Sequence, residues 1–444
     1  MKHLSCHTRC REVSNGVLRA LGIVALAAAA AGVHALDQSL ETYVDRALRV
    51  NPAIVSARSR LRAAHSGVGA SLAIPDPTVS AGYFISEVET RAGPQQGKFG
   101  ISQPIPWPGT LVGRREVAAE QVDIASEELQ QVRVQVVADL RASYAALYSA
   151  GRTLRALREN LALLEQVESV LLSRYQTGAA GQGALLRVQV ESARLEDRIG
   201  TVESNAEVYR ARIGALLDMH ADSVVAFPDS LPLLDVPDSL TLLTDMVLRH
   251  GPVVGQAREQ YEKARETVDL VRSESFSPRL MLMTDYIVTG ETESPMVAEN
   301  VRGKDAWVVG LGVTLPLWLG PKRGRVAAAR EQRGAALANI DAAANRSAAE
   351  AVAVYEEYAD AVRRIELLRS VLTPKAEQAM RLTEEAYRNA EAGIVDLLDT
   401  QRTLLGLQID LAKQRARQEA AAARLDALTG GELSGVGREG GAGP

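Results

Sequence analysis

Two carboxylates, Asp396 and Asp399, have a spacing that lets them act together on an ion. They lie three residues apart in the segment GIVDLLDTQ (393–401), so they share one face of a helix. If several copies of the chain surround a passage, each position becomes a ring of carboxylates, which attracts cations and hinders anions. The alternative is that both acids only decorate a helix N-terminus, where the helix dipole favours negative charge.

Other residues that could perform catalysis are sparse. After residue 35 the chain has no cysteine and only three histidines, His65, His220 and His250, with no HExxH or comparable ligand spacing. It contains no GxSxG and no Walker lysine loop. Most other carboxylates stand beside arginines on polar helix faces, as solvated pairs do. The sequence therefore predicts a protein that is not an enzyme and has no cofactor or resident metal.

The first 35 residues have the layout of an export signal. Four basic residues precede an apolar run over 21–32, and Val33-His34-Ala35 offers a small-residue cleavage site. Both cysteines, Cys6 and Cys10, lie before this run. Removing residues 1–35 takes away four Lys or Arg and one Glu, which moves the formal net charge from -5 to -8. Such an acidic mature chain is a poor binder of nucleic acid.

The elements that must position Asp396 and Asp399 follow from an internal repeat. Six residues of the segment 40–58 recur 200 positions later: Leu40, Leu48, Arg49, Pro52, Ala57 and Arg58 match Leu240, Leu248, Arg249, Pro252, Ala257 and Arg258. At an offset of 212, Tyr175, Gly181, Leu185, Leu186 and Gln189 match Tyr387, Gly393, Leu397, Leu398 and Gln401. We expect a first repeat over 36–226, a linker over 227–239, a second repeat over 240–430 and a disordered tail over 431–444.

Each repeat has the same predicted order. A helix comes first, and two segments of alternating hydrophobicity, typical of half-buried strands, follow it. The predicted strands are 78–85, 98–105, 279–288 and 306–317, with polar loops over 86–97 and 289–305. An apolar pattern at helical spacing then continues for about 65 residues, or roughly 100 Å. A Gly-containing turn and an antiparallel return helix complete the repeat, and Pro374 is expected to kink the second long helix.

Helices of this length belong in a coiled-coil arm or in the wall of a tube. Four strands cannot close a membrane barrel, because the smallest such barrels have about eight, whereas three copies would supply twelve. Aromatic residues at membrane interfaces form girdles around such barrels. The aromatic residues in or beside the predicted strands are Trp107, Trp307, Trp318, Tyr83, Phe84 and Tyr286. The alternative for any one of them is the general preference of aromatic rings for strands.

The duplication, together with three motifs, resembles the TolC-like outer-membrane efflux proteins. The motifs are SQPIPWPG (102–109), TLPLWLG (314–320) and GIVDLLDTQRTLL (393–405). The resemblance covers nearly all of the chain after residue 35. The first motif resembles most the metal-efflux branch typified by CusC and CzcC.

The resemblance implies a mainly α-helical fold with a small β part that trimerises. A twelve-stranded barrel in the Gram-negative outer membrane, surrounded by lipid, would continue into a periplasmic α-helical barrel. The partners that the resemblance implies are two further copies, a periplasmic adaptor protein and an inner-membrane pump of RND type. Asp396 and Asp399 would form the pore constriction. The adaptor-docking tip would comprise Tyr175, Gly181, Leu185, Leu186, Tyr387, Gly393, Leu397 and Leu398.

Two other functions remain open from the sequence. One is an elongated structural or adhesive coiled-coil protein of the cell envelope, which would not need paired strands twice in each chain. The other is a periplasmic adaptor, which normally has lipoyl-like β segments around a single helical hairpin. The exported cargo is not specified by the sequence: metal ions, drugs and secreted proteins all fit a passive duct, with metal ions ahead.

Overall fold

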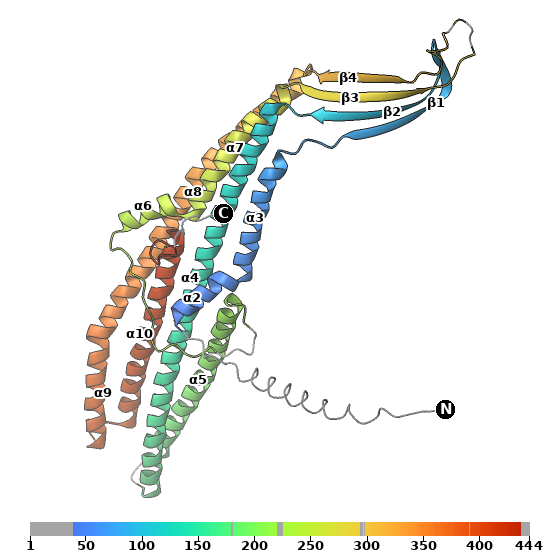
Figure 1. Cartoon of the computed structure of the whole chain (residues 1–444). Helices are drawn as coiled ribbons and strands as arrows, with labels where there is room; N and C mark the ends of the chain where they lie inside the picture. Colours follow the sequence, from blue (N-terminus) through green and yellow to red (C-terminus); the bar gives the residue numbers. More distant parts are fainter. Residues whose placement is uncertain are drawn as a thin grey trace, which may run out of the picture.

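The structure is a computed structural model that describes residues 39–178, 181–219, 225–293, 296, 298–389 and 391–436. The predicted signal segment, His220 and residues 437–444 lie outside the described residues. The molecule is an elongated array of helices with a four-stranded sheet at one end (Figure 1).

The chain repeats one order of elements twice, as predicted. The first repeat contains α2 (Leu40–Val50), α3 (Pro52–Ser71), β1 (Thr78–Thr90), β2 (Gly93–Ile105), α4 (Pro108–Gln176) and α5 (Gln182–Leu216). The second contains α6 (Leu240–His250), α7 (Pro252–Phe276), β3 (Arg279–Thr289), β4 (Ala306–Thr314), α8 (Leu319–Leu367), a π-helical turn (Leu368–Leu372), α9 (Thr373–Arg388) and α10 (Ile394–Leu428). The two return helices, α5 and α10, are each 35 residues long.

The first helix of each repeat is divided in two, which differs from the single helix expected. Pro52 and Pro252 open α3 and α7, and proline cannot donate the backbone hydrogen bond that would continue the preceding helix. In the first repeat, the Asn51 side chain accepts a 2.9 Å hydrogen bond from the Ala53 amide and so caps α3. In the second repeat Gly251 takes this place, where a Cβ would lie 2.8 Å from the Leu428 carbonyl oxygen.

The first predicted loop, residues 86–97, is instead the end of a β-hairpin. Strands β1 and β2 extend to Thr90 and Gly93, which pair directly across the turn. Polar residues continue the ladder beyond the apolar part, because backbone hydrogen bonding does not depend on side-chain polarity. In the second repeat, the described residues between Thr289 and Ala306 form the expected loop. β4 ends at Thr314, before Pro316, because proline has no amide hydrogen for the ladder.

The long helices form the wall of the molecule. α4 has 69 residues, or about 100 Å at 1.5 Å per residue. Its counterpart runs from α8 through the π-helical turn into α9, with Pro374 in the first turn of α9. The wider π turn precedes the proline and removes the clash between its ring and the preceding backbone. The expected irregularity at Pro374 is therefore a π-helical turn.

The sheet is antiparallel in the order β1-β2-β3-β4, so that β2 and β3 join the two repeats. Its register places Ile101 opposite Thr284, and Thr284 opposite Val309. β1 pairs only with β2, and β4 pairs only with β3, within the described residues. One copy of the chain thus leaves one free edge on each outer strand.

The middle of the molecule is tied together by the linker and by the residues after α10. Phe227 of the linker packs over Gly151 of α4, where a Cβ would lie 2.9 Å from the Phe227 ring. The ion pair between Arg141 and the buried Glu419, at 2.7 Å, joins α4 to α10. Residues 431–436, which the sequence assigned to a disordered tail, form turns here, and the Asp426 side chain accepts hydrogen bonds from the amides of Leu433 and Ser434.

Candidate gate and membrane-facing surface

One face of the sheet is apolar along all four strands. The register and the strand alternation place these side chains on it: Val79, Tyr83, Ile85, Phe99, Ile101, Ile105, Leu280, Leu282, Tyr286, Trp307, Val309, Leu311 and Val313. Most of them are exposed, including Ile85 (97 %) and Leu311 (68 %). The opposite face is mixed: it includes Ser80, Gly100 and a Lys98–Asp285 ion pair at 3.0 Å, but also Met281, Met283 and Val308. An exposed apolar face that runs across every strand is typical of a sheet that faces lipid.

The predicted girdle aromatics occupy both ends of this sheet. Trp107 and Trp318 are the N-cap residues of α4 and α8, where the helices leave the strands. Trp307 pairs with Tyr286 near the far end, where the Tyr286 hydroxyl donates a hydrogen bond to Asp305. Phe84 differs from the others, since strand alternation places it on the face opposite Tyr83.

Asp396 and Asp399 lie at the beginning of α10, at the end of the molecule remote from the sheet (Figure 1). Both are exposed. Asp396 accepts a 2.9 Å hydrogen bond from the Gly393 amide, so it also caps its helix. The Asp399 carboxylate is 80 % exposed and lies 4.0 Å from the Arg402 guanidinium. Of the two acids, Asp396 caps the helix, whereas the described contact of the Asp399 carboxylate is with Arg402.

The other predicted tip residues divide into buried and exposed groups. Leu397 and Leu398 are buried in a cluster that joins α4, α5, α9 and α10, and Leu185 and Tyr387 are partly buried against it. Leu186 and Tyr175 are exposed. Gly181 and Gly393 are the N-cap residues of α5 and α10. The Arg174 guanidinium lies 5.9 Å from the centre of the Tyr387 ring and so connects the two helical hairpins.

An ion pair near the tip was missed by sequence reasoning. Arg402 of α10 makes two hydrogen bonds, of 3.0 and 2.6 Å, with the carboxylate of Glu191 in α5. Glu191 is only 8 % exposed, and the hydrogen bond from Arg402 holds its pKa below the ordinary value. The spacing in sequence, 211 residues, offers no signal for this pair. The Glu191–Arg402 pair therefore holds Arg402, the residue beside Asp399, against the first repeat.

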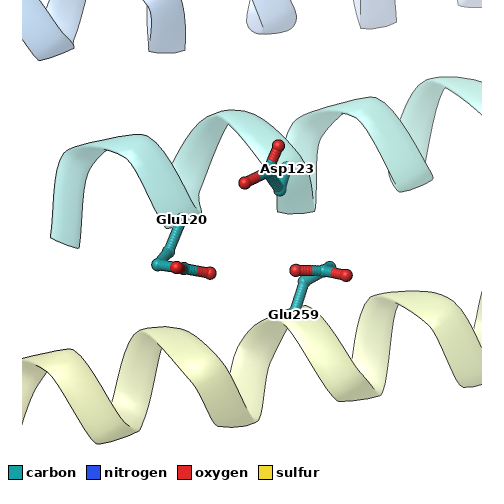
Figure 2. Close-up of side chains that lie close together, drawn as sticks. All are labelled: Glu120, Asp123 and Glu259. Carbon is teal, nitrogen blue, oxygen red and sulfur yellow. The ribbon is translucent and has the colours of Figure 1, made fainter. Parts of the chain in front are cut away.

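A second unpredicted group is a trio of carboxylates in the wall. Figure 2 shows Glu120 of α4 and Glu259 of α7 between the two helices, with Asp123 of α4 close to them; one oxygen from each of the three lies within 4.8 Å of the others. Burial, followed by repulsion from the neighbouring acids, raises the pKa of Glu120. Acidic clusters are common on helix surfaces without an ion, so this trio adds negative charge to the wall but does not define a metal site.

No described helix contains a stretch long and apolar enough to cross a membrane. Comparison with known proteins identifies the class. The model of the family "Outer membrane efflux protein" matches residues 43–217 and 243–431, one segment in each repeat. The chain belongs to this family, whose members are export channels of the outer membrane that extend into the periplasm, and not enzymes.

Individual relatives are distant. Nodulation protein T of Rhizobium leguminosarum bv. trifolii is 22% identical over 410 residues, which cover 86% of this chain and 83% of the relative. The pyoverdine export outer membrane protein OpmQ of Pseudomonas putida is 22% identical, over 73% of this chain and 68% of the relative. The solved structure of VceC from Vibrio cholerae has a TM-score of 0.73 and 18% identity, and covers 89% of this chain and 96% of that one. This likeness shows the fold.

Proposed function

We propose that three copies of the chain form a continuous duct, with a twelve-stranded barrel in the outer membrane and an α-helical barrel in the periplasm. The observation that carries this proposal is the sheet with one apolar face and two free edges, mounted on helices about 100 Å long. Joining β4 of one copy to β1 of the next closes all edges. Three copies suffice, because twelve strands exceed the smallest closed membrane barrels of about eight.

In this proposal the duct is passive, and an inner-membrane pump of RND type delivers its cargo through a periplasmic adaptor. The exposed Leu186 and Tyr175 support docking of the adaptor at the tip, since tyrosine is a common interface anchor and exposed apolar surface marks interaction sites. Site-specific photo-crosslinking from position 186 in cells tests this. Adaptor crosslinks are expected from position 186 but not from an exposed wall position such as 337, and their absence from both would reject the docking site.

The constriction is assigned to Asp396 and Asp399, with Asp399 as the main contributor to ion selectivity. Their exposure on one face of α10 at the remote end of the molecule supports this. The test is single-channel conductance of the purified trimer in a planar bilayer, beside the D396A/D399A variant. Cation-selective steps are expected in the native protein, with weaker selectivity in the variant. Unchanged ion preference in a folded trimer would remove the assignment.

For the cargo we propose metal ions, on the strength of the segment SQPIPWPG (102–109). Since relatives are named for nodulation and for pyoverdine export, the fold itself is compatible with several cargos. Deletion of the gene is expected to lower the tolerance of the host for divalent or monovalent heavy-metal ions, and the intact gene to restore it. Loss of drug tolerance alone would contradict the metal assignment.

A further inference from the structure

A cavity of about 390 Å³ lies where the sheet meets the helices. Its lining combines the last residues of β2, the first residues of β3 and the first turns of α4 and α8. Four cationic side chains line it: Arg114, Arg279, Lys322 and Arg325. The one carboxylate in the lining, Glu274, pairs with Arg114 at 3.0 Å. In the described part of the chain, no carboxylate lies within 4.0 Å of the other three cations.

The helix ends at this cavity make the unpaired charge less favourable still. α4 and α8 both begin here, each after a tryptophan N-cap that makes no side-chain capping hydrogen bond. Neither helix has an acidic residue in its first turn. Helix N-termini carry partial positive charge and free amides, which normally attract acids. Three cations beside two such termini repel one another unless an anion joins them.

The position of the cavity relative to the proposed membrane-embedded sheet is also defined. The apolar face of the sheet ends at Ile105 and Leu280, which both contribute to the lining. Trp107 is part of the lining, and Trp318, the N-cap residue of α8, is 81 % exposed. Tryptophan side chains of this kind lie at the level of lipid headgroups. Because the helices extend into the periplasm, this level is that of the periplasmic leaflet of the outer membrane.

We propose that the cavity binds the phosphate of an anionic phospholipid from this leaflet. Arg279, Lys322 and Arg325 would pair with the phosphate, and the apolar residues beside the cavity would contact the start of the acyl chains. Basic pockets at the membrane boundary bind anionic headgroups in this way. The site would anchor the duct at a fixed depth, a role separate from conduction.

The test uses detergent-purified trimers and native mass spectrometry with phosphatidylglycerol or phosphatidylethanolamine carrying the same acyl chains. The site variant is R279Q/K322Q/R325Q. The matched control, R115Q/R323Q/R330Q, removes the same charge from nearby residues of α4 and α8 that do not line the cavity. We expect native protein and control to prefer phosphatidylglycerol, and the site variant to bind it at least tenfold more weakly, since each cation beside an anionic headgroup contributes about fivefold.

Equal losses in both variants would mean diffuse attraction to a basic surface and would overturn the proposal. The absence of any preference for phosphatidylglycerol in the native protein would do the same. Millimolar inorganic phosphate forms a separate arm, in which displacement of the lipid would show a free-anion site in place of a lipid site. If the triple variant does not assemble, the single substitutions decide, each with an expected loss of about fivefold.

Discussion

Asp396 and Asp399 share a helix face but differ in their contacts. Asp396 caps α10 by accepting a hydrogen bond from the Gly393 amide, so its negative charge is partly compensated by the helix N-terminus. Asp399 projects into solvent beside Arg402, whose other contacts are with Glu191. The charge at the proposed constriction therefore depends on an arginine that the first repeat holds in place. For the same reason Asp396→Asn is a cleaner probe than Asp396→Ala, since the amide retains an oxygen that accepts the capping bond.

The Glu191–Arg402 pair is expected to control both the charge and the rigidity of the tip. In R402Q, Asp399 loses its neighbouring cation and the first hairpin loses a contact with α10, so cation selectivity and open probability should both rise. A cycle with E191Q should give a coupling of about 1–2 kcal/mol, less than for a fully buried pair because Arg402 is half-exposed. Cation selectivity and open probability are both measured in single-channel recordings, and the coupling is calculated from the open probabilities of the four proteins of the cycle.

R194Q serves as the control, because Arg194 lies 3.6 Å from the same Glu191 carboxylate but is 68 % exposed. Strictly additive effects of E191Q and R402Q would show that the pair does not hold the tip. Since Arg402 lowers the pKa of Glu191, the stabilisation should be complete above the ordinary glutamate value of about 4.3, decline below it, and be lost once the pH has fallen through the lowered pKa.

Asp426 has the opposite pH behaviour. Burial raises its pKa, so between about pH 3.9 and the raised value the native state binds more protons than the unfolded state. Its contribution to stability is therefore complete at low pH and declines as the pH rises through the folded pKa. D426N keeps an oxygen for the Leu433 and Ser434 amides and should remove this slope. D426A should instead release residues 431–436, with faster hydrogen exchange of both amides.

Equal exchange at Leu433 and Ser434 in D426A and in the native protein would show that the segment is held by other contacts. The cluster around Asp426 includes Arg141 and the buried Glu419, whose pKa burial also raises. The comparison is therefore made between D426N and D426A at one pH before the pH is varied.

At the scale of elements, the sequence predicted what periodicity encodes: the duplicated order, the four strands and the two long helices. It did not predict the breaks at Asn51 and Gly251, although the following prolines signal a restricted backbone. The hairpin over 86–97 was missed, because its polar side chains conceal a ladder made by the backbone. The Glu191–Arg402 pair was missed for a different reason, since only tertiary packing brings α5 beside α10.

We expect that the π-helical turn before Pro374 accommodates one residue more than a regular α-helix would, and that the proline ring needs the extra space this provides. Deleting Ser370 alone would convert the turn to α-helix and place the proline ring against the preceding carbonyl, which costs about 3 kcal/mol. Deleting Ser370 together with Pro374→Ala should restore a regular helix and keep Met380 and Tyr387 on the packed face. Trimer yield and thermal unfolding of the two variants measure the difference. Equal loss in both would show that the turn has a packing role of its own.

The whole molecule combines symmetric architecture with asymmetric chemistry. Both repeats supply two strands, one long helix and a return helix of 35 residues. Only the second repeat has acids at the start of its return helix, because Ala184 and Arg187 occupy the equivalent positions in the first. Duplication thus accounts for a wall of uniform length, while divergence of a few tip residues confines negative charge to one hairpin. The proposed constriction follows from this division.

The proposed membrane barrel requires the apolar face of the sheet to point toward lipid. Two positions on opposite faces of β4 can test this orientation. Leu311 lies on the apolar face, and Val308 lies on the opposite face beside Asp285. A lysine on the lipid-facing side of a barrel costs about 2–4 kcal/mol near mid-membrane, whereas a lysine facing an aqueous lumen costs little. L311K should therefore reduce the amount of folded protein in the outer membrane several-fold. V308K should insert normally and shift ion preference toward anions. The readout is the fraction that migrates as folded trimer in unheated gels of isolated outer membranes. If L311K inserts as well as V308K, or if V308K alone fails, the apolar face is not the lipid-facing side and the barrel would have to close in the opposite sense.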